Sequence, residues 1–230
     1  MSYVVVIIPA LNEEESIGQV IIDIPRGMVD EIIVVDNGST DATGRIARSI
    51  GARVIEEPER GYGNACLAGI KYVKKKYRSG STIVVFLDGD YSDHPDEMGR
   101  ILSPIRKHGY DMVIGTRTEL ENDAIAVHVR LLNMVFCKFL SIILRKKITD
   151  LGPFRAIRLS ALRKLDMQER TFGWTTEMGI KAVRRKIKWK EVPVGYRKRL
   201  GYAKISGKLG SGIMAVIVMI KTALRYQLRS

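Results

Sequence analysis

Residues 83–90 read Ile-Val-Val-Phe-Leu-Asp-Gly-Asp, an apolar run that ends in two carboxylates around one glycine. An uninterrupted apolar run of this length is typical of a strand buried on both faces of a sheet. The runs at 3–8 and 31–36 have the same character, and apolar residues recur at helical spacing between the runs. This alternation predicts βαβ units, and therefore an α/β fold with a mostly parallel central sheet flanked by helices.

The rest of the chain continues the pattern, and we find no linker that would separate two domains. We expect strands at residues 3–8, 31–36, 53–55, 82–87, 110–115, 154–158 and 188–194. We expect helices at 13–24, 41–50, 61–77, 95–107, 127–144, 175–185 and 208–228.

Length and composition are those of a globular protein. The 230 residues are 46% apolar and 27% charged, which excludes a disordered chain. Cys66 and Cys137 have no metal-type spacing and cannot form a disulfide framework, so a reducing compartment is favoured. Neither 130–145 nor 209–220 reaches the roughly 20 apolar residues of a membrane span. No secretory signal opens the chain, and we expect a cytoplasmic protein.

The charge is divided unevenly along the chain. Residues 1–124 contain 14 Lys and Arg against 20 Asp and Glu, whereas residues 125–230 contain 24 against 5. A second half this cationic is expected to face an anionic partner, such as nucleic acid, lipid headgroups or a phosphorylated substrate. A non-enzymatic nucleic-acid-binding module is one alternative. Against it, the basic residues are interleaved with core-like apolar ones and form no nucleic-acid motif, so we expect no nucleic-acid partner.

Parallel sheets bind ligands beyond the carboxyl ends of their strands, so the segments 9–13, 36–41, 88–93 and 115–117 are the candidate site. Asp88 and Asp90 would bring two hard oxygen ligands together, which suits Mg²⁺ or Mn²⁺ bridging to phosphate oxygens. The alternative is a turn whose aspartates cap the helix that starts near Pro95. Asp36 could accept bonds from a base N–H or from ribose hydroxyls, whereas Ser39 or Asp41 could cap the next helix. We expect Asp36 to be functional and Asp41 to be structural.

Four ordered blocks carry a resemblance to a known family. They are Val6-Ile7-Ile8-Pro9-Ala10-Leu11-Asn12-Glu13, Val34-Val35-Asp36-Asn37-Gly38-Ser39-Thr40-Asp41, Arg60-Gly61-Tyr62-Gly63-Asn64-Ala65 and Leu87-Asp88-Gly89-Asp90. Together they resemble family 2 glycosyltransferases, whose fold is the Rossmann-like GT-A fold. The resemblance implies a nucleotide-sugar pocket that involves Pro9, Ala10, Asn12, Glu13, Asp36, Gly61, Gly63 and Asp88. It also implies a metal held by Asp88 and Asp90, with Asp90 catalytic.

The second half is similar to the dolichyl- or polyprenyl-phosphate hexosyltransferases of that family. The matching segments are Gly115-Thr116-Arg117, Arg130, Asp150-Leu151-Gly152-Pro153-Phe154-Arg155, Phe172-Gly173-Trp174 with Glu177, and Arg199–Gly207. The resemblance implies that phosphates are held by Arg117, Arg130, Arg199 and Lys204, and it makes Arg117 and Arg199 catalytic. The sequence departs from the branch at Ser92, which stands where a third metal ligand is common and is followed by Asp93.

The resemblance implies an inverting, metal-dependent enzyme that moves a hexose from a nucleotide-diphosphate sugar to a polyprenyl or dolichyl phosphate. A phosphate acceptor is already ionised near neutral pH and needs no protein base. The alternative within the same fold transfers the sugar to a hydroxyl and needs a base, for which Glu177 and Asp150 are the candidates.

The two halves of the single domain, 1–124 and 125–230, are expected to bind the nucleotide sugar and the acceptor respectively. A basic helix at 208–228 with an apolar face could lie among anionic headgroups, so we expect peripheral attachment to the cytoplasmic face of the membrane. The apolar residues of 127–144 are expected to pack against the sheet. Trp174 is expected at the mouth of the active site.

Overall fold

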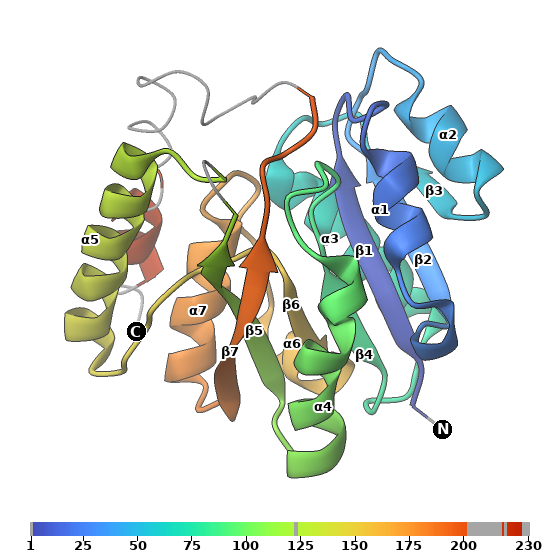
Figure 1. Cartoon of the computed structure of the whole chain (residues 1–230). Coiled ribbons are helices and arrows are strands. Elements are labelled where there is room, and N and C mark those ends of the chain that lie inside the picture. The colour runs from blue at the N-terminus through green and yellow to red at the C-terminus, as the bar shows by residue number, and fades with distance from the viewer. Residues whose placement is uncertain (1, 122–123, 202–217, 219, 227–230) are drawn as a thin grey trace.

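The computed structural model describes residues 2–121, 124–201, 218 and 220–226 (Figure 1). In this part of the chain a seven-stranded sheet has the order β3-β2-β1-β4-β6-β5-β7. The strands are β1 (Val4–Ala10), β2 (Glu31–Asp36), β3 (Arg53–Glu56), β4 (Ile83–Phe86), β5 (Met112–Leu120), β6 (Arg155–Arg158) and β7 (Trp189–Tyr196).

Helices connect most of the strands and cover both faces of the sheet. They are α1 (Ile17–Asp23), α2 (Thr43–Ser49), α3 (Tyr62–Lys76), α4 (Met98–His108), α5 (Val127–Leu144), α6 (Leu159–Leu165) and α7 (Trp174–Arg184). Two short 3₁₀ turns, Arg26–Met28 and Pro95–Glu97, precede β2 and α4. The sequence pattern did not predict α6. It predicted that β5 would end at residue 115, whereas the strand extends to Leu120.

The expected mostly parallel sheet is confirmed. β1 pairs in parallel with β2 and β4, β2 with β3, and β5 with β7. β6 is antiparallel to both of its neighbours, β4 and β5. The carboxyl ends of the parallel strands therefore meet along one edge of the sheet, where ligands bind in such folds.

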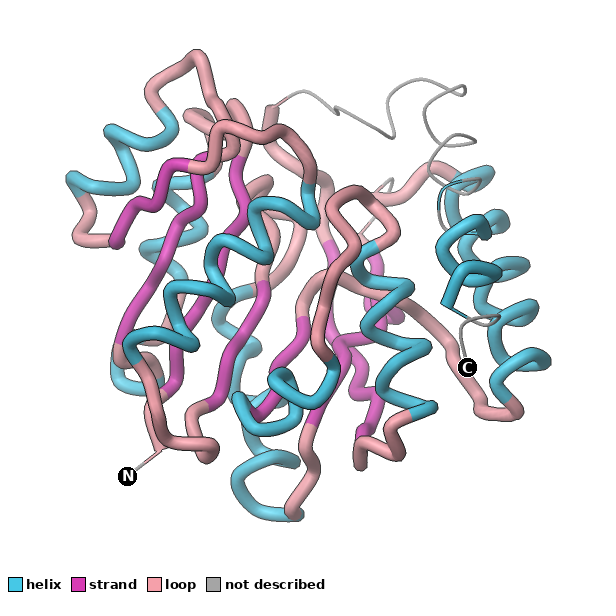
Figure 2. Tube along the Cα trace, turned by 180° about the vertical axis from the view of Figure 1, so that it is seen from behind, coloured by secondary structure: helices cyan, strands magenta, loops and turns pink. Residues whose placement is uncertain are grey.

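Alternate residues of each buried strand belong to different cores, one on each face of the sheet. In β1, Val4, Val6 and Ile8 pack with α1, α2 and α4. Val5 and Ile7 pack with α3, α6 and α7 on the other face. Figures 1 and 2 show, from opposite sides, the helices that cover the two faces of the sheet. Because both faces are covered, the strands read as continuous apolar runs in the sequence.

The helix α5 corrects one expectation, because it does not pack broadly on the sheet. Phe136, Cys137 and Leu140 join a small third core together with Ile180 of α7 and Ala223. Most of its other large apolar side chains are exposed. In the described part of the chain, α5 is also the one helix long and apolar enough to span a membrane by length and composition alone.

The expected C-terminal helix lies largely outside the described residues. Residues 218 and 220–226 are helical, and Thr222 and Ala223 are buried. Lys181 of α7 lies 4.9 Å above the ring of Tyr226, measured from Nζ to the ring centroid. The described piece therefore packs against α7, and the remainder of 208–228 is not described.

Candidate active site

A cavity of about 560 Å³ opens at the carboxyl edge of the sheet, and we call it the main cavity. The predicted residues Pro9, Ala10, Glu13, Gly61, Asp88, Asp90 and Arg199 all line it. Leu11, Asn37, Arg60, Tyr62, Ala65, Gly89, Thr171 and Phe172 line it as well. Segments from both ends of the chain therefore form a single site.

The Asp88-Gly89-Asp90 turn follows β4 directly and forms one wall of this cavity. Tyr62 of α3 donates its hydroxyl to Asp88 Oδ1 at 3.0 Å. Ser92 donates both its backbone N–H, at 3.0 Å, and its hydroxyl, at 2.5 Å, to Asp90 Oδ1. Ser92 thus orients a carboxylate instead of supplying the oxygen ligand that is common at its position.

The carboxylates of this turn form an acidic cluster whose negative charge is not balanced by nearby positive charge. Burial, and then the charge of Asp90, raise the pKa of Asp88 to about 7. Burial and the same two aspartates raise the pKa of Asp93 well above its usual range. Among the described residues, Asp93 Oδ1 is one of the buried polar atoms without a hydrogen-bond partner.

A divalent cation fits this donor set. It would be held by Asp88 and Asp90, and its charge would relieve the carboxylate repulsion. In the described part of the chain, no three His, Cys, Asp or Glu side chains are arranged as a complete metal site. The remaining positions would be left to diphosphate oxygens and water, as is usual for Mg²⁺.

Arg199 reaches the acidic turn because the segment after β7 is bound to the segment after β4. The backbone N–H of Arg197 donates to Ser92 O at 2.9 Å, and that of Leu200 donates to Asp90 O at 3.0 Å. Arg199 Nη2 then lies 3.3 Å from Asp90 Oδ2 and 3.4 Å from Glu13 Oε1. Arg199 Nε is buried and has no hydrogen-bond partner among the described residues.

The loop before α3 forms the opposite wall, and Asn37 holds it in place. The Asn37 amide nitrogen donates to the carbonyl oxygens of Glu57 and Glu59, at 3.0 and 2.8 Å. Its amide oxygen accepts the backbone N–H of Gly61 at 2.7 Å. An aspartate could not donate these two bonds, so asparagine suits this turn.

Three of the predicted nucleotide-pocket residues do not line the main cavity. Asp36 Oδ1 accepts the N–H of Ser39 at 2.9 Å, and Asn12 Oδ1 accepts the N–H of Thr40 at 2.8 Å. Both side chains therefore shape the turn after β2. Gly63 lies behind the cavity wall, where a Cβ atom would meet Glu169 O at 2.1 Å. Asp41 accepts the N–H of Thr43 at 2.9 Å, in the structural role we expected.

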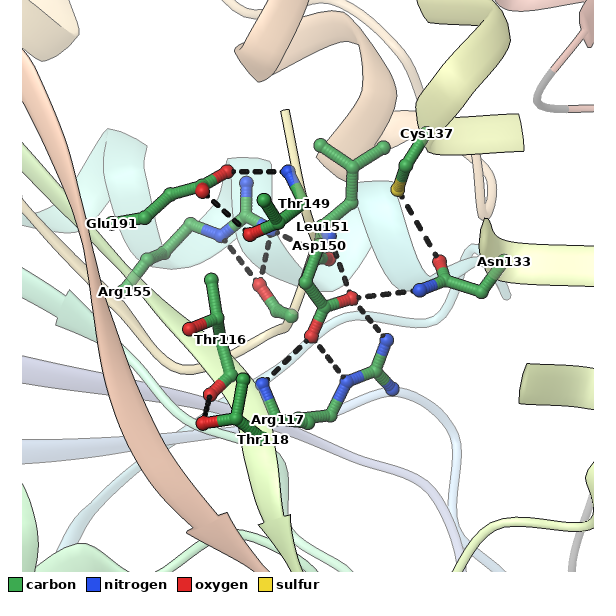
Figure 3. A network of polar contacts seen from close by, with 11 residues as sticks. Thr116, Arg117, Thr118, Asn133, Cys137, Thr149, Asp150, Leu151, Arg155 and Glu191 are labelled. Carbon is green, nitrogen blue, oxygen red and sulfur yellow. Dashed lines mark hydrogen bonds and ion pairs between the residues drawn. The ribbon is translucent and has the colours of Figure 1, made fainter. Parts of the chain in front are cut away.

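A second cavity, of about 200 Å³, lies between β5 and α5 and brings Arg117, Arg130 and Asp150 together. Arg117 binds Asp150 through Nε at 2.8 Å and Nη2 at 2.6 Å, and Asn133 of α5 donates to the same carboxylate (Figure 3). Burial alone would raise the pKa of Asp150, but Arg117 holds it below its usual range. The positive charge of Arg117 also stabilises ionised Asp88, which links the two cavities.

Two expectations about the second half are not supported by where the side chains lie. Glu177 is fully buried, and its carboxylate accepts the N–H groups of Gln168 and Glu169 and pairs with Lys181. It therefore holds a loop in place and has no free oxygen with which to act as a base. Trp174 is also fully buried, with its ring 4.7 Å from that of Phe86, so it is a core residue. Lys204 lies outside the described residues.

Among the residues of the main cavity that were not predicted from the sequence are Tyr62, Arg60, Thr171 and Phe172. Tyr62 could have been predicted as a site residue, because it stands between Gly61 and Gly63 at the start of a predicted helix. Phe172 is exposed and stands two positions before the buried Trp174, and only the structure shows which of these two aromatic residues lines the cavity.

Comparison with known proteins identifies the family. The sequence model described as glycosyl transferase family 2 matches residues 5–166. An uncharacterized glycosyltransferase of Mycobacterium tuberculosis is 33% identical over 215 residues, which covers 93% of this chain and 94% of that one. A dolichyl-phosphate hexose transferase of Haloferax volcanii is 32% identical over 228 residues, with coverage of 97% and 95%. A UDP-N-acetylglucosamine–dolichyl-phosphate N-acetylglucosaminyltransferase of Methanococcus voltae is 30% identical over 233 residues, with coverage of 90% and 89%.

Solved structures confirm the predicted GT-A fold. Glucosyl-3-phosphoglycerate synthase from Mycobacterium tuberculosis superposes with a TM-score of 0.76 at 24% identity, over 98% of this chain and 80% of that chain. That structure contains Mn²⁺, uridine diphosphate and glucosyl-3-phosphoglycerate. The family match over residues 5–166, together with these relatives along nearly the whole chain, shows that this protein is a glycosyltransferase that belongs to glycosyl transferase family 2.

Proposed function

We propose that this glycosyltransferase moves a hexose, with inversion at C1, from a nucleoside-diphosphate sugar to a polyprenyl or dolichyl phosphate. One observation carries the proposal: the acidic main cavity also holds Arg199, and a second cavity holds Arg117 and Arg130, of which Arg117 is near enough to Asp88 for its positive charge to act on that carboxylate. The names of the Haloferax and Methanococcus relatives support the same class of acceptor.

The main cavity is the site for the donor. Asp88 and Asp90 would hold Mg²⁺ or Mn²⁺, which neutralises the leaving diphosphate when it is bound. The Mn²⁺ and uridine diphosphate of the related synthase structure support this assignment. Arg199 is set to contact the same diphosphate, because its buried Nε lacks a partner within the described residues. We therefore assign Arg199 to the donor, whereas the resemblance of the sequence assigned it to the acceptor phosphate.

The second cavity is the site for the acceptor phosphate. Arg117 is held rigidly by Asp150, and Arg130 is exposed at the same cavity. A phosphate oxygen held there attacks C1 of the hexose while the bond from C1 to the diphosphate breaks, and the nucleotide leaves with that electron pair. The acceptor is already ionised, so the protein contributes orientation and positive charge.

The hydroxyl-acceptor alternative has less support, because its two candidate bases are already engaged. Glu177 binds backbone N–H groups in the core, and Asp150 binds Arg117. The alternative of a non-enzymatic nucleic-acid-binding module is wrong, since the chain belongs to an enzyme family. A polyprenyl acceptor lies in a bilayer, so the proposal includes peripheral attachment at the cytoplasmic face.

Labelled nucleotide sugars, incubated with the enzyme, Mn²⁺ and polyprenyl phosphate, test the proposal. Label should pass into the organic phase, and only when both the metal and the lipid are present. Label that appears solely in a water-soluble product would overturn the lipid-phosphate acceptor and favour a soluble one. A thermal-shift panel of nucleotide sugars with Mn²⁺ would identify the sugar and the base.

A further inference from the structure

The solvent-exposed face of α5 is apolar, whereas that of an ordinary surface helix is polar. Its exposed face consists of the large apolar side chains Val127, Leu131, Met134, Val135, Phe139 and Ile142, which we call the α5 outer face. Val127 and Ile142 are 83% and 70% exposed. Contiguous apolar surface of this kind is rare on soluble proteins and marks an interaction site.

The charges around this face select one kind of partner. Residues 124–149 contain five Lys or Arg and no Asp or Glu. Lys138 and Arg145 are exposed on α5 and just beyond its end. An apolar stripe on a segment that carries cations and no carboxylate matches the interface of an anionic bilayer, where the stripe enters the acyl boundary and the cations meet headgroups. A second copy of the chain would bring its own cations against them.

The second cavity adjoins this face. Arg130 and Met134 are exposed on α5 and also line the second cavity. A phosphate held at Arg117 and Arg130 would therefore lie at the height of the headgroups, with its polyprenyl chain directed along α5 into the membrane.

We propose that α5 lies in the plane of an anionic membrane, with its outer face in the headgroup–acyl boundary, and thereby presents the second cavity to lipid phosphates. This inference rests on the proposed function for the identity of the lipid substrate. The membrane contact itself is argued from α5 alone.

The other side of α5 explains why the helix would lie in the interface and not cross the bilayer. Phe136, Cys137 and Leu140 are buried against the domain. Asn133 Nδ2 donates to Asp150 Oδ1 at 3.0 Å. Crossing would break these contacts. The 18 residues would also extend only about 27 Å, which is short of a hydrocarbon core of about 30 Å.

Vesicle flotation tests the inference with the double substitution Leu131→Gln and Ile142→Gln, at two positions outside both cavities. The wild-type protein should float with vesicles of phosphatidylcholine and phosphatidylglycerol, and the double variant should bind them at least about tenfold more weakly. Lys138→Gln should weaken binding to these vesicles and leave any binding to pure phosphatidylcholine unchanged. Ile22→Gln is the matched control, because Ile22 is 59% exposed on α1, and it should bind like the wild type.

Two results would overturn the inference: wild-type protein that does not float, or a double variant that floats as well as the wild type. A wild-type dimer that the double substitution converts to monomer would also overturn it, because the face would then be an interface between copies. A large loss of melting temperature in the double variant would overturn it as well, because the face would then pack against another segment of this chain.

Activity measurements distinguish a failure of this inference from a failure of the proposed function. The double variant should keep its turnover of a short, water-soluble prenyl phosphate and lose turnover of polyprenyl phosphate embedded in vesicles. Equal loss on both substrates would overturn the membrane role. Normal vesicle binding without turnover of either phosphate would support the membrane role and overturn the proposed function.

Discussion

Asp88 and Asp90 are only two residues apart, but their surroundings differ. Asp88 accepts one bond from Tyr62, and burial raises its pKa to about 7. Asp90 has one oxygen fixed by Ser92 and the other 3.3 Å from Arg199. Asp90 would therefore hold the cation while it also pairs with an arginine that would contact the diphosphate.

Replacement of Asp90 by asparagine should lower turnover at least about 100-fold, because an amide carries no charge for the cation. Calorimetric titration should show that Mn²⁺ no longer strengthens binding of the nucleotide. The matched control is Asp96→Asn, at an exposed position nearby that lines neither cavity. Full activity of Asp90→Asn at limiting Mn²⁺ would contradict the metal assignment.

Arg117 and Arg130 line the same cavity but have different partners. Arg117 is paired with buried Asp150, whereas Arg130 is exposed. Arg117→Ala should lower the free energy of unfolding by about 2–3 kcal/mol, because it leaves a buried carboxylate without its counter-charge. Arg130→Ala should leave stability within about 0.5 kcal/mol.

Both substitutions should raise the KM for the prenyl phosphate, and Arg130→Ala should leave the affinity for the nucleotide unchanged. Urea unfolding and steady-state kinetics measure the two effects separately. A stability loss of equal size in both variants would contradict the structural part of this prediction. Weaker nucleotide binding in Arg130→Ala would contradict its assignment to the acceptor.

Among the helices and strands, those that the sequence predicted best are the ones buried on both sides. β1, β2 and β4 read as unbroken apolar runs because each face of the sheet meets a core. α5 was misjudged because its apolar spacing is the same whether that face meets a protein core or a membrane. β6 was expected as a strand, but its antiparallel direction depends on contacts with β4 and β5 that no local pattern contains.

The candidate site shows the same division between local and distant information. Turns that directly follow strands, such as Asp88-Gly89-Asp90, could be located because the strand fixes their position. The role of Glu177 could not be predicted, because the sequence around a helical carboxylate is the same whether that carboxylate faces a substrate or buried backbone N–H groups. The pairing of Arg117 with Asp150 joins residues 33 positions apart, and sequence spacing gives no sign of it.

Glu31 at the start of β2 links that strand to α3 and β3. Its carboxylate accepts hydrogen bonds from Tyr77, Tyr72, Lys76 and Arg53. Burial alone would raise the pKa of Glu31, but the bonds from Tyr77, Lys76 and Arg53 outweigh it and lower the pKa to about 2. A pKa lower in the folded than in the unfolded chain stabilises the fold above about pH 4.5, and this stabilisation is lost as the pH falls toward 2.

Glu31→Gln should therefore cost about 1–2 kcal/mol at pH 7, a value that allows for solvent screening of the partly exposed network. The difference from the wild type should shrink as the pH falls from 5 toward 2. Urea unfolding at several pH values measures it, with Glu56→Gln as an exposed control. A difference that does not change over this pH range would show that the network does not depend on the charge of Glu31.

The two halves of the molecule, acidic 1–124 and basic 125–230, meet around the main cavity. One contact is that of Arg199 with Asp90 and Glu13. Another joins the start of α3 to the loop before α7, where the N–H of Asn64 donates to Arg170 O at 3.0 Å. The same loop provides Thr171 and Phe172 to the cavity. The shape of the proposed donor site therefore depends on how closely these two backbones approach.

Gly63 sets that distance, because a Cβ atom there would lie 2.1 Å from Glu169 O, a backbone atom that cannot turn aside. Gly63→Ala should force the loop away from α3, lower the free energy of unfolding by about 3 kcal/mol and weaken nucleotide binding together with it. Gly27→Ala is the control, since nothing lies within 4 Å of its Cβ position. Urea unfolding and nucleotide titration measure the two quantities. If Gly63→Ala bound the nucleotide as tightly as the Gly27→Ala control, the loop that carries Phe172 would not shape the donor site, and the cavity would depend on the first half of the chain and Arg199 alone.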